Sequence, residues 1–478
     1  MTSALSQPEC EAYIQSLRLI PDVLSVGSEK WMKQLQIIEK INAQAHHSVM
    51  YTQPEFVPDL FQTYHEKIPV LIQNILAVEL WSTLVYPKIQ PAILHKSPKA
   101  SLILHHEAVL LNLLEVLFYH KECAIGASDS LTELADYCYR KVASLVVRRT
   151  TDWPLSKDIK REMNLSPQEA LEQQKKDVEF RIENSALNVL RFIAEYINDC
   201  PLGVMDVVLV KGDLIQLLVE LIQKKPWIRT KDGKAFKFED LSWQEIPARD
   251  KLKVTKPEAT VWFSLFFLCV DRNCQIKYQW DHHKSETVKK LLPFMTETLL
   301  DQLPPLTQLK NVIHTLGITQ MPDSRSTSDF LKIQAISEIR VNLMKGQNWE
   351  KIAREQERLY FDISTAQLKK ELKQFSQIYD NEVYEEAAEK AKCAKCGRPA
   401  DKRCSQCKSV FYCSADCQRN HWSTHKYSCK KVEPTKQSQQ QASMTASTSQ
   451  QNTQKKVVIE EIDDEQEKKQ TDNFDDVD

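Results

Sequence analysis

The chain has 478 residues, 42% of them hydrophobic, and a formal net charge of −2. This length and apolar content are sufficient for a sizeable buried core divided between two or more units. The near-neutral charge argues against a nucleic-acid polyanion as the partner of the whole chain. Only 8 residues are glycine, and because tight hairpins and phosphate-binding loops both use glycine, the composition favours an all-helical protein.

The first twenty residues predict no targeting segment. They contain Glu9 and Glu11 and have no basic residue before Arg18, unlike a signal or transit peptide. The most apolar run, "VWFSLFFLCV" at 261–270, is about half of the ~20 residues that a membrane-spanning helix needs. We therefore expect this run to be a buried helix, and we expect a cytoplasmic protein with no membrane insertion.

Residues 1–325 are predicted to form a helical scaffold domain. Apolar residues recur at helical spacing in the segments 101–120, 130–147, 185–197, 213–223 and 286–303. The first of these is apolar on most of its circumference, which is typical of a helix buried on several sides. The expected fold class is mainly α, and two architectures remain open for this region: a solenoid-like stack or an irregular bundle.

Two local patterns interrupt or delimit these helices. Ser130 is followed three residues later by Glu133, a spacing that predicts a capping box at the start of the helix 130–147. Asp232 and Gly233 lie between residues of alternating polarity, which predicts a small β-hairpin.

From about residue 326 to residue 392 the chain is charged and rich in glutamine. Apolar residues there are three or four positions apart, as in the stripe Leu368, Leu372, Phe375 and Tyr379. This pattern predicts a long amphipathic helical segment that leads into the cysteine cluster. Its exposed face admits two interpretations, a solvated helix at the edge of the scaffold or a coil that binds a partner.

Residues 393–429 contain seven of the 13 cysteines. The cluster has eight soft ligand positions, seven thiolates and one imidazole: Cys393, Cys396, Cys404, Cys407, Cys413, Cys417, His425 and Cys429. Eight such ligands fill two closed tetrahedral sites, so the predicted cofactor is two Zn²⁺. A closed site leaves no position for a reactive water, so the metal has a structural role. It would supply a folding free energy on the order of 10 kcal/mol per site.

The cluster resembles the MYND zinc finger in its sequence "YCSADCQRNHWSTHKYSC". The resemblance implies two interleaved sites, one formed by Cys393, Cys396, Cys413 and Cys417, the other by Cys404, Cys407, His425 and Cys429. His421 is outside this set because the eight positions are already filled. The resemblance also implies docking of short proline-containing peptides at Gln418 and Trp422. Trp422 could equally be the only large side chain in the core of the finger.

The finger is basic but lacks the features of a nucleic-acid reader. Residues 391–431 contain ten lysines and arginines against two aspartates, and with seven thiolates and two Zn²⁺ the charge is about +5. The sequence shows neither a base-reading helix nor a series of stacking aromatic residues. It also lacks a phosphate-binding loop, a zinc protease motif and the cofactor motifs of methyltransferases and iron dioxygenases. We expect a protein-binding module and no enzyme.

Residues 430–478 are predicted to be a disordered polar and acidic tail. Residues 434–454 are low-complexity and polar, and residues 460–478 contain ten acidic residues against two lysines. This tail is either a solubilising segment or, with its terminal "DDVD" carboxylates, a ligand of the kind that tetratricopeptide carboxylate clamps take from chaperones.

The order of a large glycine-poor helical region, a C-terminal finger and an acidic tail resembles the axonemal dynein arm assembly factors among MYND-finger proteins. The resemblance implies a cytoplasmic adaptor, located at centriolar satellites or in the apical region of ciliated cells. It implies as partners dynein chains, other assembly factors, and chaperones or cochaperones. The alternative is a nuclear transcriptional corepressor adaptor whose finger binds proline-containing peptides. The pattern gives no oligomeric state.

Overall fold

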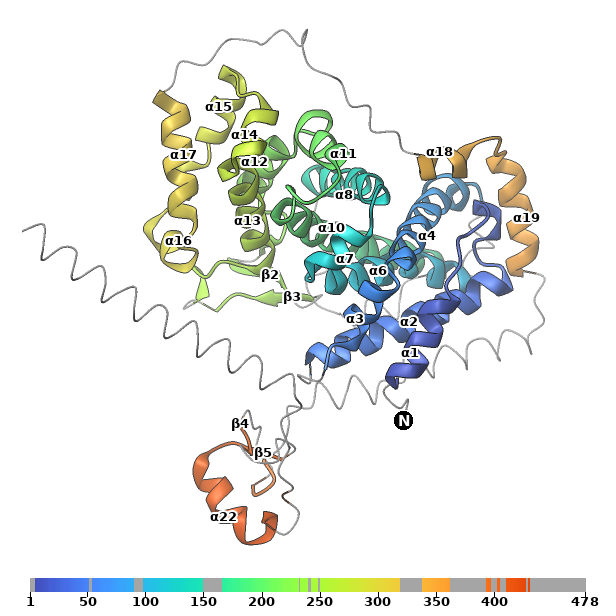
Figure 1. The fold of residues 1–478 in the computed structure, drawn as a ribbon, viewed down its shortest axis with the longest axis horizontal. Coiled ribbons are helices and arrows are strands. Elements are labelled where there is room, and N and C mark those ends of the chain that lie inside the picture. The colour runs from blue at the N-terminus through green and yellow to red at the C-terminus, as the bar shows by residue number, and fades with distance from the viewer. Residues whose placement is uncertain are drawn as a thin grey trace, which may run out of the picture. The chain divides into compact units, whose positions relative to one another are not determined.

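The computed structural model describes residues 5–50, 54–89, 98–148, 166–231, 233–239, 242–247, 250–318, 338–361, 393–396, 402–404, 410–426 and 429. It divides into two compact units, residues 2–379 and residues 380–478. The described part of the first unit is mainly helical (Figure 1), which confirms the predicted fold class. The predicted tail, residues 430–478, and the stripe Leu368–Tyr379 lie outside the described residues.

The helices of the first unit follow one another closely along the chain. They are α1 (Gln7–Ser16), α2 (Glu29–Met50), α3 (Phe56–Thr63), α4 (Ile68–Leu80), α6 (Pro98–Phe118), α7 (Lys121–Gly126), α8 (Ser130–Val147), α10 (Pro167–Glu195), α11 (Leu202–Met205), α12 (Leu214–Lys224), α13 (Lys256–Val270), α14 (Arg272–Tyr278), α15 (His282–Lys289), α16 (Glu297–Gln302), α17 (Leu306–Ile318), α18 (Glu338–Met344) and α19 (Trp349–Phe361). Short 3-10 turns occur at Val23–Ser25, His65–Lys67, Tyr86–Lys88 and Leu292–Phe294, and π turns at Trp81–Val85 and Asp206–Lys211.

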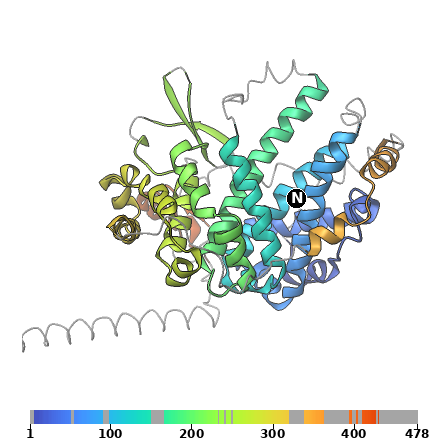
Figure 2. The same ribbon diagram turned by 90° about the horizontal axis from the view of Figure 1, so that it is seen from above.

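The long helix α10 lies at the centre of this unit, in contact with α6, α8 and α13 (Figure 2). Ser166 and Glu169 begin it with a capping box, in which the Ser166 backbone nitrogen donates to the Glu169 carboxylate at 2.9 Å. One continuous hydrophobic core extends from α1 to α19. Most helices contact near neighbours along the chain, as in a stack, whereas α18 and α19 return to early elements. The unit therefore has features of both architectures left open by the sequence.

The apolar run 261–270 is a core helix, as predicted. It forms most of α13, where Val261, Trp262 and Leu265 are fully buried. Two other helical stretches, residues 65–88 and 99–118, are long and apolar enough to cross a membrane, yet 72% and 61% of their apolar windows are buried inside the fold. A core helix of a large helical bundle meets the same criteria of length and composition.

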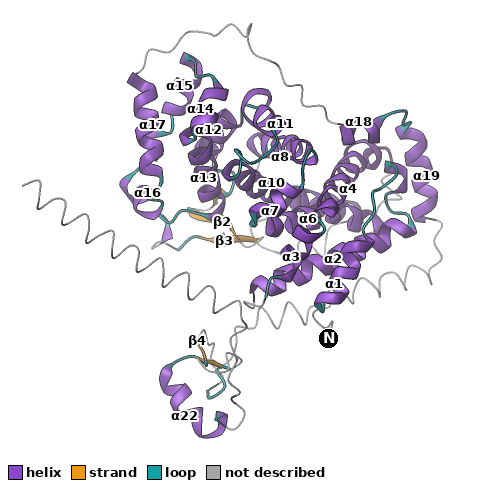
Figure 3. Cartoon of the chain, viewed as in Figure 1, coloured by secondary structure: helices purple, strands orange, loops and turns teal. Residues whose placement is uncertain are grey.

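The predicted hairpin is confirmed and belongs to a three-stranded antiparallel sheet (Figure 3). Strand β1 (Ile228–Lys231) pairs with β2 (Lys234–Glu239) across a turn in which Gly233 has a φ of +74°. A third strand that the sequence did not reveal, β3 (Ser242–Glu245), pairs with β2. The sheet packs on α10 through Phe180, whose ring lies 4.7 Å from Phe238 and 5.8 Å from Trp243.

The predicted capping box at Ser130 is wrong. The Ser130 hydroxyl donates to the Ala127 carbonyl oxygen at 2.5 Å, and α8 begins without a side-chain cap. The Glu133 carboxylate instead accepts the backbone N–H groups of Ile339 and Arg340, at 2.6 and 2.9 Å. These are the first N–H groups of α18, so Glu133 caps a helix about two hundred residues further along the chain.

The described part of the segment 326–392 differs from the expected long helix. Residues 338–361 form two short helices, α18 and α19, separated by Gly346 with a φ of +70°. Asn348 then caps α19, because its side-chain oxygen accepts the N–H of Lys351 at 3.0 Å. A left-handed glycine followed by a capping residue ends one helix and starts another.

Helices α18 and α19 pack against the first helices of the chain. Figures 1 and 2 show them beside α4, which α18 contacts, while α19 contacts the turn before α2 and the two turns that follow α4. The Gln356 side chain is fully buried and donates to the carbonyl oxygens of Val23, Leu24 and Val26 at 3.1–3.3 Å. Its own oxygen accepts from Trp81. This polar contact attaches residues 338–361 to the scaffold.

A second buried polar group links α2, α4 and α6. The Trp31 indole nitrogen donates to the Asn74 side-chain oxygen at 3.2 Å, and the Asn74 amide lies 3.4 Å from His106 Nε2. His106 is fully buried, and this burial lowers its pKa to about 3. The imidazole is therefore neutral at physiological pH and serves as a packing group of the core.

Candidate metal centre

The finger begins with a short turn and a two-stranded ladder that present cysteines at their ends. Strand β4 (Lys402–Arg403) pairs antiparallel with β5 (Phe411–Tyr412). Cys404 directly follows β4, and its N–H donates to the Val410 carbonyl at 2.8 Å. Cys413 directly follows β5. The ladder therefore positions one cysteine from each of the two expected sites.

Helix α22 (Ala415–His425) supplies the next two positions. Ser414 caps it by accepting the Cys417 N–H at 3.2 Å, which holds Cys417 in the first turn. His425 ends the helix, and the Cys429 N–H donates to its carbonyl at 2.9 Å. One helix thus reaches from the first group of ligands to the second.

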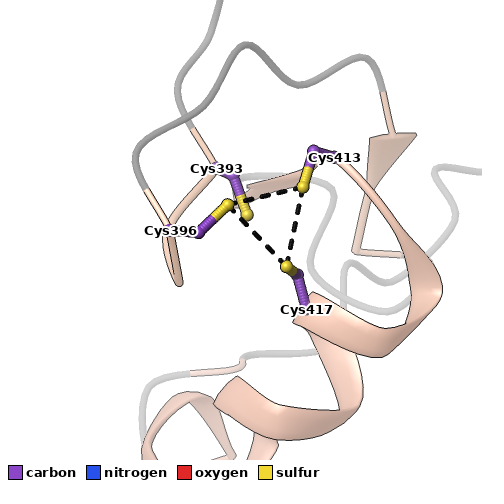
Figure 4. Close-up of side chains that lie close together, drawn as sticks. All are labelled: Cys393, Cys396, Cys413 and Cys417. Atoms are coloured by element: carbon purple, nitrogen blue, oxygen red, sulfur yellow. Dashed lines mark hydrogen bonds between the residues drawn. The ribbon is translucent and has the colours of Figure 1, made fainter.

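The first group consists of Cys393, Cys396, Cys413 and Cys417. Figure 4 shows their four sulfur atoms converging from the turn, from the end of β5 and from α22. The sulfur of Cys396 lies 3.5 Å from that of Cys413 and 3.8 Å from that of Cys417. All four sulfurs lie within 4.8 Å of one another.

These distances fit a metal and not a disulfide. Four sulfurs bound to one Zn²⁺ at ~2.3 Å in a tetrahedron lie ~3.8 Å apart, whereas a disulfide brings two sulfurs to ~2.05 Å. The observed separations of 3.5 and 3.8 Å match the tetrahedron. The first group therefore has the donor set and spacing of a closed zinc site.

The thiols of the first group influence one another's ionisation. Burial opposes ionisation of Cys393, but the backbone N–H groups of Cys413, Lys395 and Cys396 donate to its sulfur and lower its pKa to about 6. Contacts with the thiols of Cys396 and Cys417 raise the pKa of Cys413 to about 12. Four adjacent thiolates repel one another, and a divalent cation removes that penalty because a coordinating thiol loses its proton.

The second group consists of Cys404, His425 and Cys429, whose ligand atoms also lie within 4.8 Å of one another. The sulfurs of Cys404 and Cys429 are 3.8 Å apart. Cys407, the fourth ligand expected from the sequence, lies outside the described residues. The finger thus has two groups of ligands that fit Zn²⁺. Its described ligands are divided between the two sites as the MYND resemblance implies.

Tyr412 and not Trp422 fills the small core of the finger. Tyr412 is 1% exposed and packs among Cys393, Cys404 and the neighbouring sulfurs, whereas Trp422 is 40% exposed. Successive side chains of a strand point to opposite faces, so the position of Tyr412 beside the ligand Cys413 did not by itself indicate this burial.

His421 lies between the core tyrosine and the second group. Its Nδ1 is 3.0 Å from the Tyr412 hydroxyl, and its ring stacks at 6.1 Å on that of His425. It belongs to neither group of ligand atoms. Gln418, the other residue expected to contact peptides, is half-buried on α22, while Trp422 is exposed to solvent.

Comparison with known proteins identifies the finger. The model of the MYND finger family matches residues 393–429. The chain is also 27% identical over 461 residues to the "Zinc finger MYND domain-containing protein 10 homolog" of Drosophila melanogaster, a similarity that covers 90% of this chain and 100% of the fly protein. Similarity to that relative therefore extends through the helical unit.

Other relatives share only a segment of about the length of the finger. Human "Tudor domain-containing protein 1" is 50% identical over 42 residues, which is 9% of this chain and 4% of that protein. "Ubiquitin carboxyl-terminal hydrolase 19" of Arabidopsis thaliana is 51% identical over 49 residues, 10% of this chain and 7% of that protein. No solved structure shows significant similarity to the chain. The chain thus contains a segment that matches the MYND finger family, and it is similar along nearly its whole length to the "Zinc finger MYND domain-containing protein 10 homolog" of the fly.

Proposed function

We propose that the protein is a cytoplasmic adaptor for the assembly of axonemal dynein arms, with the finger and the helical unit as separate binding surfaces for partner proteins. The match to the MYND finger family supports a protein-binding role, and a closed metal site, which leaves no position for a reacting water, agrees with a structural metal. The observation that supports the proposal most is the similarity to the fly protein over the whole chain, helical unit included.

The form of the helical unit agrees with a binding role. Titratable groups whose pKa differs strongly from its ordinary value include His106, Cys138 and Cys269. All three are fully buried in the core. Burial raises the pKa of both thiols well above the ordinary value, so neither is an accessible nucleophile. Among the described residues, the unit also has exposed apolar side chains, such as Leu202, Leu252 and Ile276.

The proposal can be tested in ciliated cells in which the endogenous protein is replaced by a tagged copy. The wild-type chain should purify together with dynein heavy or intermediate chains and with chaperones, and should be located in the cytoplasm. The variant Cys404→Ala, which removes a metal ligand of the second group, should lose part of these partners and shorten or remove the dynein arms. Cys200→Ala, a matched change at a half-buried cysteine of the helical unit, should retain both.

Two results would contradict the proposal. One is the presence of normal dynein arms in cells that lack the protein. The other is a steady nuclear location with transcriptional repressors as the purified partners, which would favour the corepressor role instead.

A further inference from the structure

Helix α22 has an exposed face opposite to its metal ligands. Arg419, Trp422 and Lys426 are spaced three and four residues apart, so they lie on one face of the helix, and all three are exposed. Trp422 is 40% exposed, and the Arg419 side chain is 76% exposed. The face therefore consists of an aromatic ring with a cation on each side along the helix. We call Arg419, Trp422 and Lys426 the basic aromatic face.

The charge of Arg419 remains available on this face. Arg419 forms an ion pair with Asp416 at 2.5 Å, but both side chains are 76% exposed, and such surface pairs contribute little. Asp416 is the only acidic residue of α22. The finger as a whole has a charge of about +5 once two Zn²⁺ are bound. A ligand for this face should be acidic and should contain an apolar side chain.

The C-terminal residues of the same chain have that chemistry. Residues 460–478 have a formal charge of −8, and the last eight, "TDNFDDVD", place Phe474 among Asp472, Asp475, Asp476 and Asp478. Carboxylates at these positions can reach cations on both sides of a ring that contacts Phe474. Arginine and lysine bind carboxylates, and aromatic pairs add stabilisation beyond the area that they bury.

We propose that the C-terminal segment 460–478 docks on the basic aromatic face of its own finger. Phe474 would contact Trp422, and the surrounding aspartates would pair with Arg419 and Lys426. This contact lies within the chain and so goes beyond the proposed function. It has a consequence for that function, because a tail bound at Trp422 competes with any partner that needs the same face.

The length of the intervening chain permits this contact. Residues 430–471 separate Cys429 from Asp472, and a coil of that length has an end-to-end distance of ~35 Å. The face from Arg419 to Lys426 spans only ~11 Å of helix. The tethered tail therefore has an effective concentration on the order of 1 mM at the finger, so that even an intrinsic Kd of ~100 µM leaves it bound most of the time.

A labelled synthetic peptide of residues 460–478 tests the proposal by fluorescence anisotropy against zinc-loaded protein. The peptide should bind a chain that ends at residue 459. It should bind the full chain about tenfold more weakly, because the tethered tail occupies the face. The charge reversal Arg419→Glu with Lys426→Glu in the shortened chain should weaken binding at least tenfold, as should raising the salt from 50 to 500 mM.

The control is the same charge reversal on the helical unit, Lys351→Glu with Arg354→Glu, whose side chains are 74% and 77% exposed. It should leave binding unchanged. If the double variant at the finger lost its zinc, the variant Trp422→Ala would be used instead, provided that it retains two Zn²⁺. It should also bind the peptide more weakly. Equal binding to the full and shortened chains, or undiminished binding to the finger variant, would overturn the proposal. So would tail-dependent self-association of the full chain, which would place the tail on a second copy.

Discussion

The side-chain oxygen of Gln356 accepts a hydrogen bond from the indole nitrogen of Trp81, and both side chains are fully buried. The two residues are 275 positions apart in the sequence. The same Gln356 amide donates to three carbonyl oxygens of the turn at residues 23–26. One polar side chain therefore connects α19 to two early segments of the scaffold.

Gln356→Ala should lower the free energy of unfolding of the helical unit by about 2–4 kcal/mol, because it removes every hydrogen bond of a buried amide. Urea denaturation followed by far-UV circular dichroism measures this change. Gln308→Ala, at an exposed position of α17, is the matched control and should be close to neutral. Equal stabilities of the two variants would show that Gln356 does not attach α19.

Glu133→Ala should loosen the start of α18, because the carboxylate accepts the N–H groups of Ile339 and Arg340. The expected loss is about 1–2 kcal/mol, as for other helix caps. Hydrogen exchange measured by mass spectrometry should show faster exchange in the peptide that contains residues 338–344. Glu350→Ala, at an exposed position of α19, should leave exchange there unchanged; unchanged exchange in Glu133→Ala would refute the capping role.

We expect the helical unit to lose stability in acid because the His106 side chain is buried in its neutral form. Burial lowers its pKa to about 3 in the folded protein, whereas an exposed imidazole in the unfolded chain titrates near ~6.5. The unfolded chain therefore binds the proton first, and stability falls as the pH drops below ~6.5 towards 3. The contribution of this group is up to ~1.4 kcal/mol per pH unit.

His106→Leu should reduce that slope, although the variant will be less stable at pH 7 because packing in the core changes. Urea denaturation at pH 7, 6 and 5 gives the slope for both proteins. The pKa values of His46 and His105 are also lowered by burial, so a smaller slope should remain. An identical slope in the variant would mean that His106 binds its proton at the same pH in the folded and the unfolded chain.

Two histidines one helical turn apart should differ in their effect on zinc content. His425 belongs to the second ligand group, whereas His421 contacts the Tyr412 hydroxyl. His425→Ala should lose at least one Zn²⁺ per chain, and His421→Ala should retain two. Native mass spectrometry of the purified chain counts the metal directly. If His421→Ala lost zinc and His425→Ala did not, His421 and not His425 would be the metal ligand.

Patterns that depend on neighbouring residues could be predicted from the sequence. The helical core, the hairpin at Gly233 and the metal-ligand cluster follow from apolar periodicity, turn chemistry and ligand spacing. The division of the ligands into two groups followed from the MYND resemblance. Strand β3 could not be predicted, because its residues, Ser242–Glu245, are mostly polar and its pairing with β2 depends on Phe180 from α10. Local sequence contains no information about such a distant aromatic partner.

Glu133 and Gln356 were missed for a related reason. Glu133 has the spacing of a local cap, but its carboxylate accepts the N–H groups of Ile339 and Arg340 at the start of α18. Gln356 belongs to a charged segment that the sequence assigns to solvent, although the side chain is fully buried. In both cases a polar residue forms a long-range contact, which overrides what its local pattern indicates. In the finger, the exposure of Trp422 and the burial of Tyr412 likewise depended on packing around the metal ligands.

We infer that two zinc ions form a structural finger that is separate from the helical unit. Native mass spectrometry and circular dichroism of the full chain, before and after chelation, test it together. We predict two Zn²⁺ per chain, both removed by the chelator, with most of the helical signal retained because the helical unit has its own core. Fewer than two Zn²⁺ per chain, or collapse of the helical signal on chelation, would contradict the account.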